Sequence, residues 1–168
     1  NAPFSLSYEL PAKEGKYTIE ISATDISVDE EDIDDAEKLN RKNVWSYNVA
    51  VDANYPELTF TTANKSKTGS NKAKDVEGVA KDSNGITSIK RFVLGADGKI
   101  TGPAETKWVS GEAGNSISYN KATGVWEDTL SAEVIGAKDG VRRYVVSDIY
   151  GKETSADFIF YVDATRPT

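Results

Sequence analysis

The side chains that could do chemistry in this sequence are mainly its 27 aspartates and glutamates, because histidine and cysteine are both absent. Without histidine there can be no Ser-His-Asp or Cys-His catalysis and none of the common zinc sites, and without cysteine there is no disulfide or thiolate ligand. Two uses of carboxylates remain: oxygen ligation of a hard cation, and acid-base hydrolysis of glycosides. Hydrolysis needs two acids facing each other across a cleft, and no motif marks such a pair. The chain is therefore predicted not to be an enzyme.

The densest run of acids lies between Asp25 and Glu37, which hold eight acidic residues and no basic one. An EF-hand calcium loop needs glycine at position six and glutamate at position twelve. Counted from Asp25, those positions hold Glu30 and Ala36, so the pattern fails and a solvated charged loop is predicted. Acids come first and bases last over Asp29–Asn43, an order that favours a short helix within this loop.

The rest of the chain is close to neutral, although the whole chain carries a net charge of −7. One cluster of lysines lies in Asn64–Lys74 without any aromatic residue, which predicts a mobile loop rather than a binding patch. No basic stripe is present to replace phosphate counterions, so nucleic acid is not expected as a partner. The longest apolar run, Phe158–Val162, is far shorter than the roughly 20 residues that span a bilayer, so membrane insertion is not expected either.

The composition favours β-structure, with 25 valines and isoleucines and 14 threonines against only 6 leucines. Apolar and polar residues alternate in Tyr17–Ala23 and in Trp45–Val51, which predicts two half-buried strands of an antiparallel sheet. Phe4–Leu10 is a further strand candidate, ended by Pro11.

Strand signals resume after Pro56, and turn signatures separate them. Seven short strands of this kind suggest a β-sandwich with Greek-key connections. The predicted strands are Leu58–Thr62, Asp75–Lys81, Ile86–Leu94, Thr106–Ser110, Val125–Leu130, Val141–Ser147 and Ala156–Val162.

The sequence also contains an internal repeat. Gly15–Asp25 corresponds to Gly140–Asp148, and each stretch is followed by a strand that ends in Val-Asp-Ala, at Val51–Ala53 and Val162–Ala164. The first copy has about 12 extra residues that coincide with the acidic run, as expected for an insertion in a surface loop. This pattern resembles the tandem bacterial immunoglobulin-like repeats of large surface and secreted proteins.

The resemblance implies an all-β chain of immunoglobulin-like Greek-key sandwiches, in which one complete module follows the C-terminal part of another. Residues 1–53 would be the partial module with its acidic insertion, and residues 54–168 the complete one. The function implied is a non-catalytic structural or adhesion role, as a spacer or protein-binding repeat, outside a bacterial cell or on its surface. The partners implied are neighbouring modules of the same chain and a host or cell-surface macromolecule.

The same resemblance suggests a metal site. In an immunoglobulin-like sandwich, the two loops that would contain Asp82 and Asp148 lie at the end where the chain enters, and Asp52 lies in the segment leading to that end. Three carboxylates meeting there would suit calcium, and no other cofactor is expected. The alternative is that each aspartate accepts hydrogen bonds only within its own turn.

The three tryptophans raise an alternative function, a carbohydrate-binding accessory module of a secreted enzyme. Trp45 and Trp126 lie in alternating strands and are predicted to belong to the core. Trp108, in Lys107-Trp-Val109, is predicted to be the exposed one and is the candidate residue for stacking on a sugar.

Overall fold

The computed structural model describes residues 5–24 and 42–164, and nearly all of its regular structure is β-strand. The chain divides into two compact units, residues 1–53 (unit 1) and residues 54–168 (unit 2). The predicted acidic loop over Asp25–Glu37 lies outside the described residues. So does most of the predicted helix over Asp29–Asn43, of which Lys42 and Asn43 begin a strand instead.

Unit 1 contains an antiparallel pair of strands, β1 (Gly15–Thr24) and β2 (Lys42–Val51), so both alternating segments form strands as predicted. The register pairs Ile21 with Trp45, which places the two apolar rows on one face. That face is not buried: Trp45 is 46% exposed and Tyr47 is 55% exposed. The prediction that Trp45 belongs to the core is wrong, because no second sheet within the described part of unit 1 covers it.

The strand predicted at Phe4–Leu10 is not formed by the residues of that segment that the structure describes, Ser5 to Leu10. Leu6 and Tyr8 are each 71% exposed. Among the described residues the β1–β2 sheet has no third strand, so this segment lacks the ladder of backbone hydrogen bonds that defines a strand.

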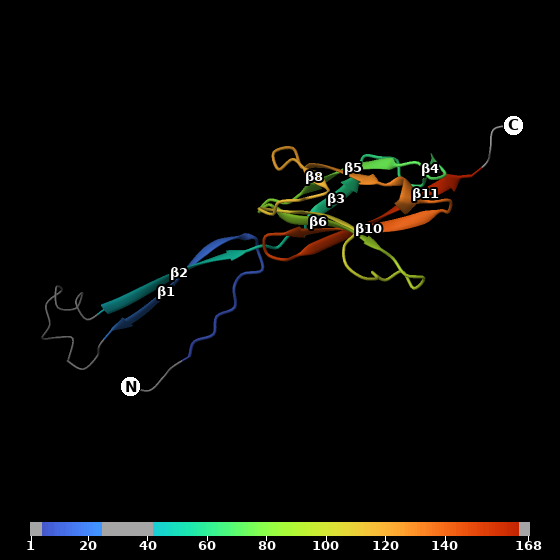
Figure 1. The fold of residues 1–168 in the computed structure, drawn as a ribbon. Helices are drawn as coiled ribbons and strands as arrows, with labels where there is room; N and C mark the ends of the chain where they lie inside the picture. The colour runs from blue at the N-terminus through green and yellow to red at the C-terminus, as the bar shows by residue number, and fades with distance from the viewer. Residues whose placement is uncertain (1–4, 25–41, 165–168) are drawn as a thin grey trace, which may run out of the picture. The chain divides into compact units, whose positions relative to one another are not determined.

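Unit 2 is a sandwich of two sheets, which Figure 1 shows as two layers. The five-stranded sheet has the order β4 (Ser66–Gly69), β11 (Glu153–Asp163), β10 (Gly140–Asp148), β6 (Ile86–Val93) and β7 (Thr106–Val109). The four-stranded sheet has the order β3 (Glu57–Phe60), β5 (Lys74–Lys81), β9 (Val125–Leu130) and β8 (Ser118–Tyr119).

Each of the seven strands predicted after Pro56 is present in unit 2, and two further strands were not predicted. One of them, β4, lies within the segment Asn64–Lys74, for which a mobile loop was predicted. That prediction is wrong for Ser66–Gly69, because these residues pair in parallel with Phe160–Asp163. A single helical turn, α2 (Ala132–Ile135), follows β9 and is capped by the Ser131 side chain, which accepts a hydrogen bond from the Val134 amide.

The core of unit 2 lies between its two sheets, and aromatic side chains form its centre. Trp126, Tyr144, Phe158 and Phe160 are each at most 1% exposed, so the prediction that Trp126 is a core residue is confirmed. A Cβ atom on Gly78 would lie 2.6 Å from the Trp126 ring, so only glycine fits at that position of β5. Among the described residues no helix is long and apolar enough to cross a bilayer.

The chain enters and leaves unit 2 at opposite ends. At its start, the Asn54 carbonyl accepts a hydrogen bond from Lys152 Nζ at 2.9 Å, which places Asn54 beside the turn between β10 and β11. β11 then runs for 11 residues from that turn to Asp163. At about 3.3 Å per residue, the two ends are separated by about 36 Å.

Candidate metal centre

Asp148 ends strand β10 and is held in a tight turn. Its Oδ1 accepts hydrogen bonds from the amides of Tyr150 at 2.7 Å and Lys152 at 3.0 Å. The residue is only 1% exposed, and its Oδ2 receives no hydrogen bond from any residue that the structure describes. A buried carboxylate oxygen without a donor is costly, so this atom calls for a partner of another kind.

Asp82 directly follows strand β5 and occupies a similar turn. Its Oδ1 accepts a hydrogen bond from the Asn84 amide at 2.7 Å, and its carbonyl accepts one from the Gly85 amide at 3.3 Å. The alternative prediction was that each aspartate accepts hydrogen bonds within its own turn. Asp82 and Asp148 both do so. In both residues the carboxylate takes part in these turn hydrogen bonds through Oδ1 alone.

The two turns lie at the same end of the sandwich because β6 pairs with β10. Asp148 pairs with Ile86, the first residue of β6, and the Thr87 hydroxyl donates to the Asp148 carbonyl at 2.7 Å. Asp52 follows the last residue of β2 and precedes the buried Pro56 by four residues, a stretch that spans at most about 14 Å.

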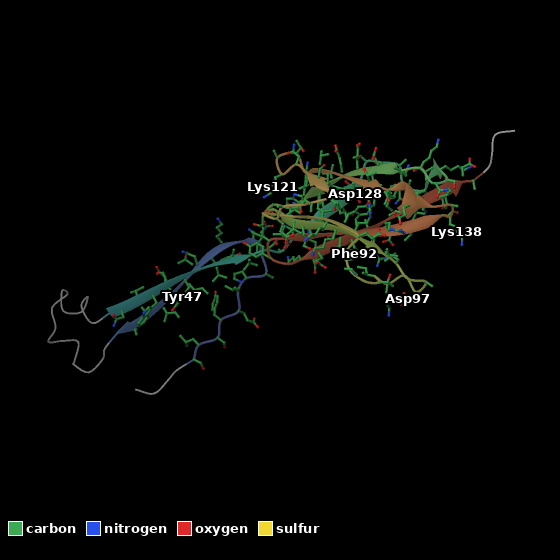
Figure 2. The ribbon with its side chains drawn as sticks, viewed as in Figure 1. Tyr47, Phe92, Asp97, Lys121, Asp128 and Lys138 are labelled. Atoms are coloured by element: carbon green, nitrogen blue, oxygen red, sulfur yellow. The ribbon has the colours of Figure 1, made fainter. Side chains whose placement is uncertain are left out.

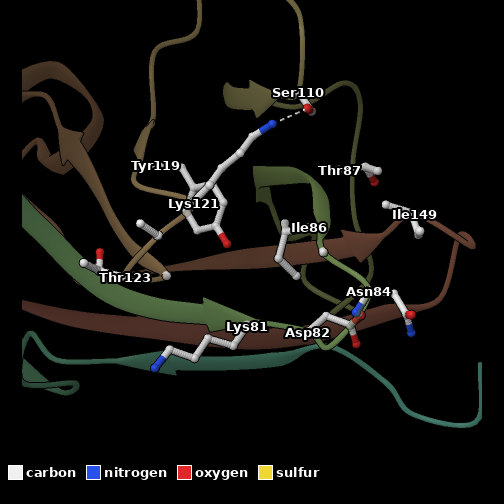
Figure 3. Close-up of a pocket in the computed structure, with 13 residues that line it drawn as sticks. Lys81, Asp82, Asn84, Ile86, Thr87, Ser110, Tyr119, Lys121, Thr123 and Ile149 are labelled. Carbon is white, nitrogen blue, oxygen red and sulfur yellow. Dashed lines mark hydrogen bonds between the residues drawn. The ribbon is translucent and has the colours of Figure 1, made fainter.

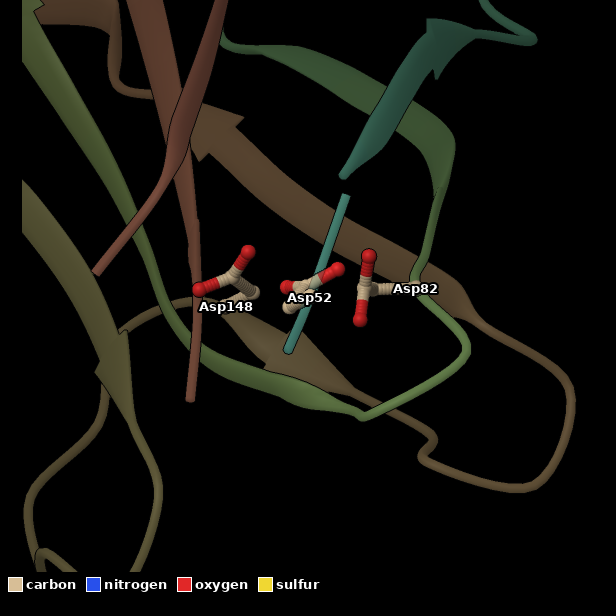
Figure 4. A group of neighbouring side chains, drawn as sticks. All are labelled: Asp52, Asp82 and Asp148. Carbon is tan, nitrogen blue, oxygen red and sulfur yellow. The ribbon is translucent and has the colours of Figure 1, made fainter. Parts of the chain in front are cut away.

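Figure 4 shows the carboxylates of Asp82 and Asp148, the two predicted ligands that belong to unit 2, whereas Asp52, the third, belongs to unit 1. A carboxylate oxygen of Asp82 lies within 4.8 Å of a carboxylate oxygen of Asp148. Two oxygens that each lie 2.3–2.6 Å from one calcium ion are separated by at most about 5 Å, so the spacing fits ligands of a single ion. With oxygen as the only donor type, the group suits a hard cation.

A neighbouring cavity of about 440 Å³ lies beside Asp82 (Figure 3). Lys81, Tyr119 and Lys121 are among the residues that line it, and Lys121 Nζ donates to Ser110 Oγ at 2.8 Å. Asp82 is the single carboxylate of this lining, so the cavity does not offer the pair of acids that glycoside hydrolysis requires.

Trp108, the residue predicted to stack on a sugar, is buried: only 8% of it is exposed. Its ring meets the Tyr119 ring edge to face at 4.6 Å between centroids, and Lys121 Nζ lies 5.6 Å from its centroid. The prediction of an exposed Trp108 is wrong, and the exposed tryptophan is Trp45. Since successive strand residues face opposite sides, the exposed Lys107 already indicates that Trp108 faces inward.

Sequence reasoning missed a buried charged cluster between the two sheets. Arg91 Nη1 lies 2.6 Å from Asp128 Oδ2, which also accepts the Tyr144 hydroxyl at 2.9 Å, and Arg91 Nε lies 3.0 Å from Glu105 Oε2. Figure 2 marks Asp128. The period of two along each strand could have revealed this cluster. It places Arg91 on the same face of β6 as Ile89, and Asp128 on the same face of β9 as Trp126.

The electrostatics of this cluster are those of a structural site. Burial by itself lowers the pKa of Arg91, but the nearby Asp128, Tyr144 and Glu105 outweigh it, and the pKa is raised. Burial, followed by the charge of Asp128, raises the pKa of Tyr144. Arg91 therefore stays charged and Tyr144 stays neutral, and both are held by Asp128 on the opposite sheet.

No protein-family model matches the chain, and no curated protein matches it. Among solved structures, a similar one is CopC from Methylosinus trichosporium OB3b, at 17% sequence identity and a TM-score of 0.39, covering 68% of this chain and 99% of that one.

Proposed function

We propose that this chain is a non-catalytic structural part of a bacterial surface or secreted protein built from tandem immunoglobulin-like modules, and that unit 2 acts as a spacer. The observation that carries the proposal is a shared register of two hairpins, one in each unit. Binding of a further macromolecule through the turns stays a prediction from the sequence.

The pairing register of the two hairpins agrees with the repeat that the sequence pattern suggests. When the Val-Asp-Ala endings of β2 and β11 are aligned, and Asp25 is aligned with Asp148, Tyr17 corresponds to Gly140 and Val49 to Phe160. β1–β2 pairs Tyr17 with Val49, and β10–β11 pairs Gly140 with Phe160. The other residue pairs of the two hairpins correspond in the same way. Two unrelated hairpins would share this register only by chance.

The strand order of unit 2 supports an immunoglobulin-like topology. The strands of an immunoglobulin sandwich are lettered in chain order. One sheet has the order A, B, E, D, and the other contains C, F and G. The four-stranded sheet β3-β5-β9-β8 fits the first set, and β6, β10 and β11 of the other sheet fit the second. β7 then occupies the place of the additional strand beside C.

The spacer role is supported by the path of the chain through unit 2. A module whose two ends lie about 36 Å apart adds length whenever it is repeated, whereas a module whose ends lie together does not.

Small-angle X-ray scattering of chains with one, two and three copies of residues 54–168 tests this role. Each copy should add about 36 Å or slightly more to the largest dimension, because the ends of the module are opposite. A control series with eight Gly-Ser residues inserted at each junction should show a broader distance distribution, since such linkers are flexible. Growth of the first series as one compact particle would contradict the proposal.

A further inference from the structure

We propose that the cavity beside Asp82 binds an acidic sugar residue of a glycan, such as a hexuronic acid, and that Lys121 holds the carboxylate of this sugar. The cavity has a volume of about 440 Å³, and all of its lining residues belong to unit 2. Sites for small ligands in proteins measure about 300–1,000 Å³, so one sugar ring fits. The lining comes mainly from the β5–β6, β8–β9 and β10–β11 turns and from Ser110, which follows β7 (Figure 3).

Lys121 is held in position by two contacts of its ammonium group. Its Nζ donates a hydrogen bond to Ser110 Oγ at 2.8 Å and lies 5.6 Å from the centroid of the Trp108 ring. The Ser110 amide in turn donates to the Thr87 carbonyl at 2.9 Å, which fixes the backbone of Ser110. A charged group that is already in place loses little conformational entropy when a ligand binds.

The ammonium group of Lys121 has donors left for an anion. It carries three N–H donors, and the bond to Ser110 uses one of them. No carboxylate in the described part of the chain forms an ion pair with Lys121, nor with Lys81, the second lysine of the lining. The lining thus holds two lysines and one acid, Asp82, in a chain whose net charge is −7. An anionic ligand is therefore favoured at this place over a neutral or cationic one.

The other lining groups match the surface of a sugar ring. Asn84 donates through its side-chain amide to Ser83 Oγ at 3.3 Å, while its Oδ1 accepts no hydrogen bond from the described residues and can accept one from a hydroxyl group. Ile86 and Ile149 offer apolar surface to the C–H face of the ring, and Ile149 is 51% exposed. A uronic acid combines a carboxylate, hydroxyl groups and apolar faces. The acidic side chain of a protein has only the carboxylate, so the acidic sugar makes more of these contacts.

Titration of the isotopically labelled full chain with the methyl glycoside of glucuronic acid, followed by NMR, tests the site. The methyl glycoside of glucose is the matched ligand, because it has a hydroxymethyl group in place of the carboxylate. We expect saturable shifts of the amide signals of Asn84, Ser110 and Lys121, with a Kd of about 1 mM for a ligand of about 14 non-hydrogen atoms. The glucose glycoside should bind about tenfold more weakly or worse, because it cannot form the charge-assisted bond to Lys121.

Two lysine variants separate the site from general effects of charge. Lys121→Gln should weaken binding of the glucuronic acid glycoside about tenfold, because glutamine can still donate to Ser110 but carries no charge. Lys138→Gln is the matched control, since Lys138 is also exposed but precedes β10, whereas the cavity lies at the other end of that strand. Figure 2 marks both lysines. The control should leave the Kd unchanged, and both variants should unfold at about the urea concentration of the wild type because each replaces an exposed side chain.

Three results would overturn the proposal. The first is the absence of saturable shifts up to about 20 mM ligand, well above the expected Kd. The second is equal binding of the two glycosides, or an equal loss of affinity in Lys121→Gln and Lys138→Gln, because Lys121 would then not hold the carboxylate. The third is binding of poly-L-glutamate with the same shifts and a lower Kd, which would assign the cavity to an acidic protein segment. None of these results bears on the spacer role, which the scattering experiment tests separately.

Discussion

Two hairpins of this chain have the same pairing and different surroundings. In β1–β2, Tyr47 is 55% exposed; in β10–β11, the corresponding residue, Phe158, is fully buried. The difference is the second sheet, which covers β10–β11 in unit 2 and has no counterpart in the described part of unit 1. Strand pairing therefore follows from local sequence, while burial depends on what is packed against the face.

The cross-strand pairs of the two hairpins also exchange large and small residues. Tyr17 pairs with Val49, where Gly140 pairs with Phe160. Likewise Ile21 faces Trp45, where Tyr144 faces Ala156. In unit 2 the Phe160 ring lies over Gly140, where an added Cβ would be 2.3 Å from it. At each of these paired positions, the strand that carries the larger side chain in one hairpin corresponds to the strand that carries the smaller one in the other hairpin.

The largest expected effect is the contrast between Phe158→Ala and Tyr47→Ala, two truncations at equivalent positions. Phe158→Ala should lower the free energy of unfolding of unit 2 by about 3–5 kcal/mol, because it leaves a cavity in the core. Tyr47→Ala should cost less than about 1 kcal/mol, because Tyr47 is mostly exposed. Urea denaturation followed by tryptophan fluorescence and circular dichroism measures both.

Equal costs for these two substitutions would mean that the face of β1–β2 is covered in solution as β10–β11 is. The comparison would then break down. Phe158→Leu is a control for the cavity, since it keeps most of the buried volume and should cost much less than alanine.

An intermediate effect is expected from Tyr144→Phe, which removes the hydroxyl that donates to Asp128. We expect a loss of about 1.5–3 kcal/mol at neutral pH, because the lost bond is to a charged group. The equivalent residue of unit 1, Ile21, has no hydroxyl to lose.

The same substitution should change the dependence of stability on pH. Burial and Asp128 raise the pKa of Tyr144, so the folded chain keeps a proton that the unfolded chain releases near pH 10. This contribution is fully present below pH 10 and is lost as the pH rises, by about 1.4 kcal/mol per pH unit. Wild type should therefore lose stability faster than Tyr144→Phe between pH 10 and 12, and parallel curves would contradict the assignment.

The smallest effect is expected from Thr18→Val, which places in β1 the residue type that β10 has at the equivalent position, Val141. It removes an exposed hydrogen bond of 3.0 Å from the Thr18 hydroxyl to Asn48 Oδ1. The change in the free energy of unfolding should stay within about 0.5 kcal/mol, as for most exposed substitutions. A loss above 1 kcal/mol would show that unit 1 depends on this polar pair.

Period-two alternation predicted most of the strands, and in unit 2 one face of those strands packs against the core. It could not predict β4, where Ser66–Gly69 is polar and is held by parallel pairing with a distant strand. It also could not predict which apolar faces are covered, so Trp45 was assigned to a core. Turn position and strand order did predict that the turns of Asp82 and Asp148 lie at one end of unit 2, because β6 pairs with β10.

The parallel pairing of β4 with β11 has a mechanical consequence. Because the chain enters unit 2 near the start of β11 and leaves at its end, tension on the two ends would pull β4 and β11 in opposite directions along their length. The hydrogen bonds between them would be loaded in shear, all together, instead of opening one after another. Such a geometry resists stretching, which would benefit a module exposed to flow or to traction between surfaces.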